Sequence, residues 1–162
     1  MSQNQQIAFI GGGNMATALI KGLLDAGNRP GAVRVSEPDK DRRGRLRDQF
    51  GIQVFDNASE AVQDAHVVVL AVKPAIVQVV LDEISLELDS SVLIISIAAG
   101  VTMSQLIACL SPGDAVVRVM PNTPALIGAG ISVLYGAPGI SAQKMVQARD
   151  IMAAVGDVEE IS

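Results

Sequence analysis

The stretch Ile7-Ala8-Phe9-Ile10-Gly11-Gly12-Gly13-Asn14-Met15-Ala16 decides the fold, because a short apolar run leads directly into a glycine turn and then into a helical segment. Gly11 permits the tight turn, and Gly13 lets the backbone approach a phosphate with no side chain in between. Ala16 takes the third small-residue position of the GxGxxG/A pattern, which allows close helix–strand packing. A helix beginning at Asn14 directs backbone N–H groups and its positive dipole end at an anion. The stretch therefore predicts a site for the pyrophosphate of a dinucleotide, and an ordinary glycine-rich turn is the alternative.

The composition indicates a single α/β domain with an aliphatic core. The chain has 162 residues, enough for one hydrophobic core, with no Trp, one Tyr and three Phe. Ala, Val, Ile and Leu must therefore fill the core, which suits parallel strands buried on both faces. The formal net charge of −5 argues against a general nucleic-acid-binding protein, which normally has a basic excess. We expect one dinucleotide-binding domain over residues 1–162.

Strand and helix signals alternate with short connections, as in repeated right-handed βαβ units. Residues 66–72 form an apolar run that we place at the centre of the sheet, and Asp39 can cap the helix that follows the second strand. The predicted strands are 7–10, 32–36, 52–55, 66–72, 92–97, 115–120, 131–135 and, as a short edge strand, 157–161. The predicted helices are 14–26, 40–50, 59–64, 75–84, 103–110 and 141–155. The predicted fold class is α/β: a doubly wound Rossmann-type domain with a mostly parallel sheet and helices on both faces.

Ligands of open α/β sheets bind beyond the carboxyl ends of the strands, so the turns at that edge are candidate contacts. Lys73, after the fourth strand, either attracts a phosphate or points to solvent. The turn at residues 98–100 is small enough for a flat ring to approach the backbone, although a tight turn needs only its glycine. In Met120-Pro121-Asn122-Thr123-Pro124, two prolines stiffen a polar pair. Asn122 could orient a nicotinamide carboxamide there, or the segment is a turn packed against the next strand.

The end of the second strand decides between NAD and NADP. An acidic residue there bonds the ribose hydroxyls, whereas an Arg or a hydroxyl accommodates a 2′-phosphate. The sequence contains both kinds of residue. Glu37 favours NAD, but Ser36, Arg42 and Arg43 would form a phosphate pocket if Glu37 turned outward.

Four segments give the chain a resemblance to a known family. They are Phe9-Ile10-Gly11-Gly12-Gly13-Asn14-Met15-Ala16, Leu70-Ala71-Val72-Lys73-Pro74, Ser96-Ile97-Ala98-Ala99-Gly100-Val101 and Arg118-Val119-Met120-Pro121-Asn122-Thr123-Pro124. With these segments in this order, the chain resembles the N-terminal domain of pyrroline-5-carboxylate reductase. The resemblance covers nearly the whole chain, and the combination of GNMA, VKP, AAG and MPNTP is far more specific than the glycine pattern alone.

The resemblance implies an enzyme that reduces 1-pyrroline-5-carboxylate to L-proline, the last step of proline synthesis, with NADPH favoured and NADH often usable. Family members continue into an all-helical domain that forms the dimer and contributes the substrate-carboxylate site through an SGSGPAY-like segment. This chain stops at Ser162. By resemblance it is a cofactor-binding half without catalytic residues of its own and with little or no turnover alone. Without the partner helices, we expect Ile151, Met152 and Val155 to be more exposed than in a full enzyme.

The cofactor-binding residues that we expect come from the glycine turn, the ribose pocket and the turns at the carboxyl edge. Asn57 belongs to them by resemblance, as an adenosine-ribose contact. Its alternative role is to start the next helix as an N-cap, which Ser59 could do instead. The full set is Gly11, Gly13, Asn14, Met15, Ser36, Arg42, Arg43, Asn57, Ala71, Val72, Lys73, Pro74, Ala98, Ala99, Gly100, Pro121 and Asn122.

The remaining polar residues carry no chemistry in our interpretation. His66 has no neighbour that completes a nucleophile–base pair, and Cys109 lies on an apolar helix face without a second ligand. Arg45 and Arg47 fit a solvated helix face. We find no metal-ligand spacing and no paired catalytic carboxylates, which suits hydride transfer by a cofactor. A single cysteine, a polar start at residues 1–6 without a secretory signal, and no membrane-length apolar run lead us to expect a cytoplasmic protein.

Two other functions remain open. One is the cofactor domain of a different NAD(P)-dependent reductase, of the β-hydroxyacid or coenzyme-F420-linked type. The other is a nucleotide-binding module that performs no catalysis.

Overall fold

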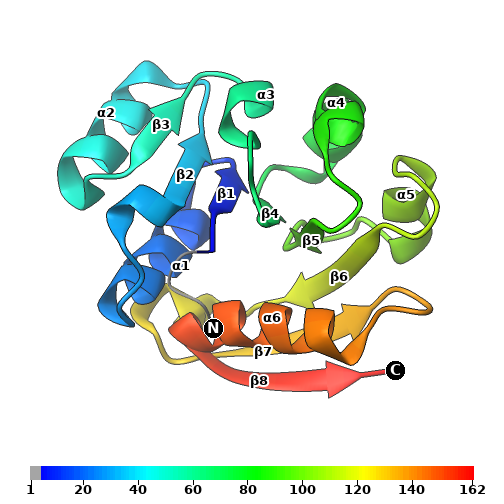
Figure 1. Ribbon diagram of the computed structural model, residues 1–162. Coiled ribbons are helices and arrows are strands. Elements are labelled where there is room, and N and C mark those ends of the chain that lie inside the picture. The colour runs from blue at the N-terminus through cyan, green and yellow to red at the C-terminus, as the bar shows by residue number, and fades with distance from the viewer. Residues whose placement is uncertain (1–4) are drawn as a thin grey trace.

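The computed structural model describes residues 5–162, so four of the six polar residues at the start of the chain lie outside the described residues. The fold is one eight-stranded sheet with helices on both faces (Figure 1). The strands are β1 (Ile7–Ile10), β2 (Val33–Ser36), β3 (Gln53–Phe55), β4 (Val67–Leu70), β5 (Leu93–Ser96), β6 (Ala115–Met120), β7 (Gly130–Gly136) and β8 (Gly156–Ile161). The helices are α1 (Asn14–Asp25), α2 (Lys40–Phe50), α3 (Ala58–Ala61), α4 (Pro74–Ile84), α5 (Met103–Ala108) and α6 (Ala142–Met152).

The strand order is β3-β2-β1-β4-β5-β6-β7-β8, and only the β6–β7 pair is antiparallel. The predicted doubly wound, mostly parallel sheet is therefore confirmed. From β1 the chain winds outward to β2 and β3, and it then crosses back to place β4 on the other side of β1. This reversal makes the carboxyl ends of β1 and β4 the topological switch point, where open α/β sheets bind ligands.

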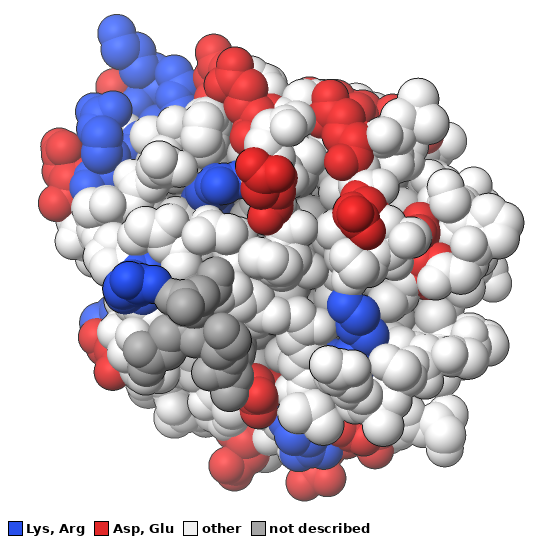
Figure 2. Space-filling model, in the orientation of Figure 1, with Lys and Arg blue, Asp and Glu red and all other residues white. Residues whose placement is uncertain are grey.

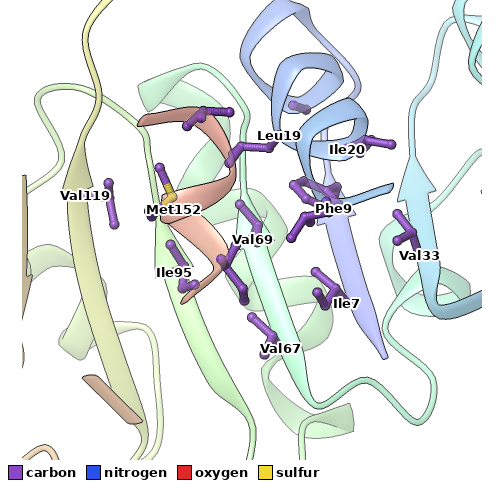
Figure 3. Close-up of a cluster of buried hydrophobic side chains, with 14 of the residues drawn as sticks. Ile7, Phe9, Leu19, Ile20, Val33, Val67, Val69, Ile95, Val119 and Met152 are labelled. Atoms are coloured by element: carbon purple, nitrogen blue, oxygen red, sulfur yellow. The ribbon is translucent and has the colours of Figure 1, made fainter. Parts of the chain in front are cut away.

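Side chains of alternate residues along β1 and β4 enter two separate apolar layers. Phe9 and Val69 face the layer that α1 and α6 cover, whereas Ile10 and Leu70 face the layer beneath α3, α4 and α5. Figure 3 shows the first layer, in which Leu19 of α1 and Met152 of α6 lie over the central strands. Because the central strands are covered on both faces, they read as continuous apolar runs in the sequence.

Several element ends differ from the sequence-based prediction. The run at residues 66–72 pairs only from Val67 to Leu70, because the chain leaves the sheet there to border the switch point. The helix predicted at 59–64 is α3, which spans 58–61 and begins earlier because the Asn57 side chain accepts a hydrogen bond from the Glu60 N–H. Short 3₁₀ turns at 30–32, 85–87, 123–127 and 153–155 were not predicted.

The expectation that Ile151, Met152 and Val155 would be more exposed than in a full enzyme is wrong. All three are at most 1% exposed. They pack in the layer of α1, and β8 folds back beside β7 to extend the sheet under α6. Arg149 of α6 also contacts β8, since its guanidinium lies 3.0 Å from a carboxylate oxygen of Glu160.

The two edge strands of the sheet, β8 and β3, differ in character. β8 is an edge strand, as predicted, and its Asp157, Glu159 and Glu160 are exposed. The opposite edge, β3, has three residues. Within residues 5–162, none of the helices has both the length and the apolar character needed to cross a membrane.

Two helical glycines allow a matched test of the packing of α1. A Cβ on Gly22 would lie 2.3 Å from the carbonyl oxygen of Ala154, whereas a Cβ on Gly44 in α2 would meet only the tip of Arg47 at 3.7 Å. We expect Gly22→Ala to lower the free energy of unfolding by about 1–3 kcal/mol through overpacking. Gly44→Ala should raise it by about 0.5–1 kcal/mol, because alanine is the better helix former.

Urea denaturation of both variants and the wild type measures this difference. Because the gain in helix propensity is common to both substitutions, their difference reports the α1 contact alone. Equal effects of the two substitutions would show that α1 can move away from residue 154 without cost.

Candidate dinucleotide-binding site

Four turns enclose a cavity of about 550 Å³ at the switch point. They follow β1, β2, β3 and β4 at residues 11–13, 36–38, 56–58 and 71–73, and one side of α4 completes the wall. The sequence brings these turns together because the carboxyl ends of parallel strands meet at one edge of the sheet.

Gly11 is the tightest point of the cavity wall. Its φ is +99°, and a Cβ built on it would lie 2.4 Å from the carbonyl oxygen of Ala71. Its N–H donates a 2.8 Å hydrogen bond to the carbonyl oxygen of Ser36. The predicted role of Gly11 in a tight turn is confirmed by this backbone geometry, which only glycine adopts without strain.

Gly13 differs from Gly11 because a Cβ on it would meet no atom within 4 Å. It is the N-cap of α1, and no side chain caps the helix there. Its φ of −75° and ψ of −165° are open to any residue. Glycine at this position therefore keeps space free in front of the helix N-terminus, where the N–H groups of the first turn and the helix dipole favour an anion.

Glu37 follows β2 and is buried, although it is a carboxylate. Its Oε1 accepts a 3.1 Å hydrogen bond from the N–H of Gly12 and lies 3.3 Å from an Nη1 of Arg42, and its Oε2 accepts a 3.0 Å bond from the N–H of Asp39. Glu37 therefore faces the glycine turn. The outward orientation on which the predicted phosphate pocket depended does not occur.

The structure separates the basic cluster that Arg42, Arg43, Arg45 and Arg47 form in the sequence. Arg42 lines the cavity, but an Nη1 of Arg43 donates to the carbonyl oxygens of Glu37 and Pro38. Arg45 and Arg47 are exposed on α2, and Figure 2 shows the Lys and Arg side chains gathered over this helix at upper left. Only one arginine of the cluster is thus available at the cavity.

The start of α2 is fixed by Asp39, whose carboxylate accepts hydrogen bonds from the N–H groups of Arg42 and Asp41. These two bonds hold the pKa of Asp39 below its usual value, with the bond from Arg42 the larger cause. The cap holds the first turn of α2, and with it Arg42, beside the cavity.

Asn57 and Asp56 border the cavity from the end of β3. The Oδ1 of Asn57 accepts from the N–H of Glu60, so Asn57, rather than Ser59, is the N-cap of α3. Its Nδ2 donates to Oδ1 of Asp56. The side chain thus has the capping role that the sequence left open, and it also borders the cavity, as a ribose contact would.

The turn after β4 places Lys73 at the cavity and Pro74 beside a second one. Lys73 is the N-cap of α4, and Pro74 is its first residue. Pro74 and Gly100 line a neighbouring cavity of about 470 Å³ between α4 and α5. Ala98 is buried, and Gly100 has a φ of +79°, so the turn after β5 is as compact as predicted.

Asn122 lies at the carboxyl end of β6, and its Oδ1 accepts a 2.9 Å hydrogen bond from the N–H of Ile131. The segment therefore contacts the next strand, as the alternative interpretation held. Residues 123–127 form a 3₁₀ turn, and Pro124 is the second residue of this turn. Pro121 and Asn122 line neither of the two cavities.

The predicted residues thus divide into two groups. Those that line the larger cavity are Gly11, Gly13, Ser36, Arg42, Asn57, Ala71, Val72 and Lys73. Those that do not are Asn14, Met15, Arg43, Pro74, Ala98, Ala99, Gly100, Pro121 and Asn122.

Sequence reasoning missed the apolar wall that α4 contributes. Ile76 is 44% exposed and Val79 is 62% exposed, and both line the cavity together with Glu83. Their spacing of three and four residues places them on one helix face. This second apolar stripe, beside the one that contains Val77 and the core residues of α4, was the signal available in the sequence.

His66 and Cys109 lie away from the cavity. Nδ1 of His66 accepts a 2.9 Å hydrogen bond from the N–H of Gln6, which gives this exposed side chain a structural role. Burial raises the pKa of the Cys109 thiol, and the charge of Asp82 adds to this. Among residues 5–162, no group of three or more His, Cys, Asp or Glu side chains is placed to hold a metal ion.

A glycine turn, an uncapped helix N-terminus and a buried acid, all at the switch point of a doubly wound sheet, define the Rossmann class of dinucleotide-binding domain. The amino-acid sequence assigns the chain to one family within this class. It belongs to the family described as "NADP oxidoreductase coenzyme F420-dependent", whose sequence model matches residues 6–100.

Known proteins similar to this chain are pyrroline-5-carboxylate reductases. That of Pseudomonas aeruginosa is 44% identical over 151 residues, which are 93% of this chain and 55% of the relative. The structure of the Coxiella burnetii enzyme matches 98% of this chain and 59% of its own with a TM-score of 0.94 and 34% identity. That of the Plasmodium falciparum enzyme, solved with NADP bound, has a TM-score of 0.87, 28% identity and covers 100% of this chain. The chain spans little more than half the length of these relatives.

The same substitution at Gly11 and Gly13 should have opposite consequences. Gly11→Ala is expected to lower the free energy of unfolding by about 2 kcal/mol or more, because it combines a positive φ with a backbone clash. Gly13→Ala should lower stability by only about 1 kcal/mol or less, because nothing lies near its Cβ and the cost is that of alanine at an N-cap. It should nonetheless weaken dinucleotide binding about tenfold or more, since the methyl group fills the space before the helix N-terminus.

Thermal melts and calorimetric titrations with NADH and NADPH measure both effects. Wild-type affinity in a stable Gly13→Ala protein would show that no phosphate approaches α1.

Proposed function

We propose that this chain is the nicotinamide-dinucleotide domain of a pyrroline-5-carboxylate reductase, which reduces 1-pyrroline-5-carboxylate to L-proline. The observation that carries the proposal is the match to the Coxiella burnetii enzyme over 98% of this chain at 34% identity. The glycine turn and the cavity at the switch point supply the site that such a domain needs. Pyrroline-5-carboxylate is accordingly the small-molecule substrate of the whole enzyme.

The residues present fit a dinucleotide. Gly13 leaves open space at the N-terminus of α1 for the pyrophosphate, and Ser36 and Glu37 lie where the adenosine ribose binds in domains of this class. Ile76 and Val79 offer an apolar wall for a base. The turns after β5 and β6, with Ala98 and Asn122, follow strands on the β4 side of β1, and in our proposal they face the nicotinamide.

A bound reduced nicotinamide supplies the hydride that the imine carbon accepts. This chain contributes by holding the dinucleotide, and the apolar wall formed by Ile76 and Val79 excludes water from the bound base. The groups that bind the substrate carboxylate and place a hydroxyl near the imine belong, in our proposal, to the helical domain of the whole enzyme. That domain would also form the homo-oligomer. We therefore expect the chain alone to bind the dinucleotide without measurable turnover, and we propose a cytoplasmic setting.

A chimera tests the proposed substrate. In the Pseudomonas aeruginosa relative, the segment that matches this chain would be replaced by residues 5–162. We expect the chimera to oxidise NADH or NADPH in the presence of 1-pyrroline-5-carboxylate, as followed at the nicotinamide absorbance band, and to form proline. The matched control is the same chimera with Gly13→Ala, which should fold but need a dinucleotide concentration about tenfold or more higher for the same rate.

Other results would favour other functions. A folded chimera that binds the dinucleotide but reduces only a hydroxyacid's ketone or coenzyme F420 would assign the chain to a different reductase. Dinucleotide binding without turnover of any of these substrates, even in the chimera, would favour a binding module.

A further inference from the structure

The Glu37 carboxylate is held on three sides. Its side chain is 5% exposed. Two backbone N–H groups, those of Gly12 and Asp39, and the guanidinium of Arg42 donate to it at 3.0–3.3 Å. A carboxylate accepts about four hydrogen bonds, so one acceptor position remains for a ligand hydroxyl. Because the donors belong to the glycine turn and to α2, turning Glu37 outward would break contacts in both.

The wall of the cavity carries more acidic than basic side chains. Glu37, Asp56 and Glu83 line it together with only two cations, Arg42 and Lys73. A 2′-phosphate would add close to two negative charges beside Glu37, where a ribose hydroxyl adds none. The charges of the wall therefore favour an unphosphorylated ribose.

Arg42 is the cavity arginine that could accept a 2′-phosphate, but it is already paired with Glu37. Its side chain is 45% exposed and can move. Moving it to a phosphate would leave the buried Glu37 charge with its two backbone donors only. Arg43 offers no substitute, because it does not line the cavity and its Nη1 donates to the carbonyl oxygens of residues 37 and 38.

We propose that Glu37 is the specificity-determining residue of the cofactor site and selects NADH over NADPH. It accepts a ribose hydroxyl, repels a 2′-phosphate and occupies the guanidinium of Arg42. The inference rests on the proposed dinucleotide site. It reverses the NADPH preference that the family resemblance implies.

Calorimetric titration of the chain with NADH and with NADPH tests the proposal. The wild type should bind NADH more tightly. Glu37→Gln should shift the ratio of the two dissociation constants toward NADPH by about tenfold or more, because it removes the charge and frees Arg42. Glutamine keeps an oxygen that accepts from the N–H of Gly12, so the glycine turn should retain its shape.

Two variants show whether the shift is local. Glu83→Gln removes the same charge from the α4 side of the cavity and should shift the ratio far less than Glu37→Gln does. Arg42→Ala in the Glu37→Gln background should cancel most of the gain in NADPH affinity. A shift in Glu83→Gln equal to that in Glu37→Gln would overturn the proposal.

The wild-type ratio makes the proposal testable even if Glu37→Gln does not fold, since tighter binding of NADPH by the wild type contradicts it directly. Binding of both nucleotides with a ratio that Glu37→Gln leaves unchanged would overturn the selectivity of Glu37 and leave the proposed function standing. Binding of neither nucleotide would overturn both.

Discussion

The close approach of Gly11 to Ala71 is the constraint on which the rest of the structure depends. No side chain fits between these two backbones, since even a Cβ would lie 2.4 Å from the carbonyl oxygen. The approach sets β1 directly beside β4, and this pairing creates the switch point of the sheet. It also turns the chain sharply enough for α1 to start at Asn14 with its N-terminus at the cavity. The apolar layers and the cavity therefore share one geometric origin.

Much of the fold could be predicted because its signals are local. The strand–glycine–helix stretch at residues 7–16 defines its own conformation, and apolar runs mark the strands that are buried on both faces. The ends of elements were less predictable. An apolar run does not show where pairing stops, and at β4 the sheet ends at Leu70 although the run continues to Val72. The antiparallel direction of β7 likewise has no signal in residue periodicity.

The site was predictable in its backbone and less so in its side chains. Glycine positions follow from conformational limits that act within a few residues. The direction of Glu37 depends instead on the N–H of Gly12, which is 25 residues away in the chain. Arg43 was expected at a phosphate, but the carbonyl oxygens of a turn that it helps to close take its guanidinium. The burial of Ile151 depends on packing in the layer of α1, between segments far apart in the chain, which no local pattern predicts.

The acidic side chains of β8 have a consequence for how the chain behaves at high concentration. An open strand edge offers unpaired N–H and C=O groups that another strand can join, and this is a common route to aggregation. On β8, Asp157 and Glu159 are exposed, whereas Glu160 is paired with Arg149. A second β8 brought alongside would meet like charges at short range, so edge-to-edge addition is opposed by repulsion, and this opposition weakens as salt screens the carboxylates. The exposed carboxylates of β8 thus oppose the addition of another strand to this edge of the sheet.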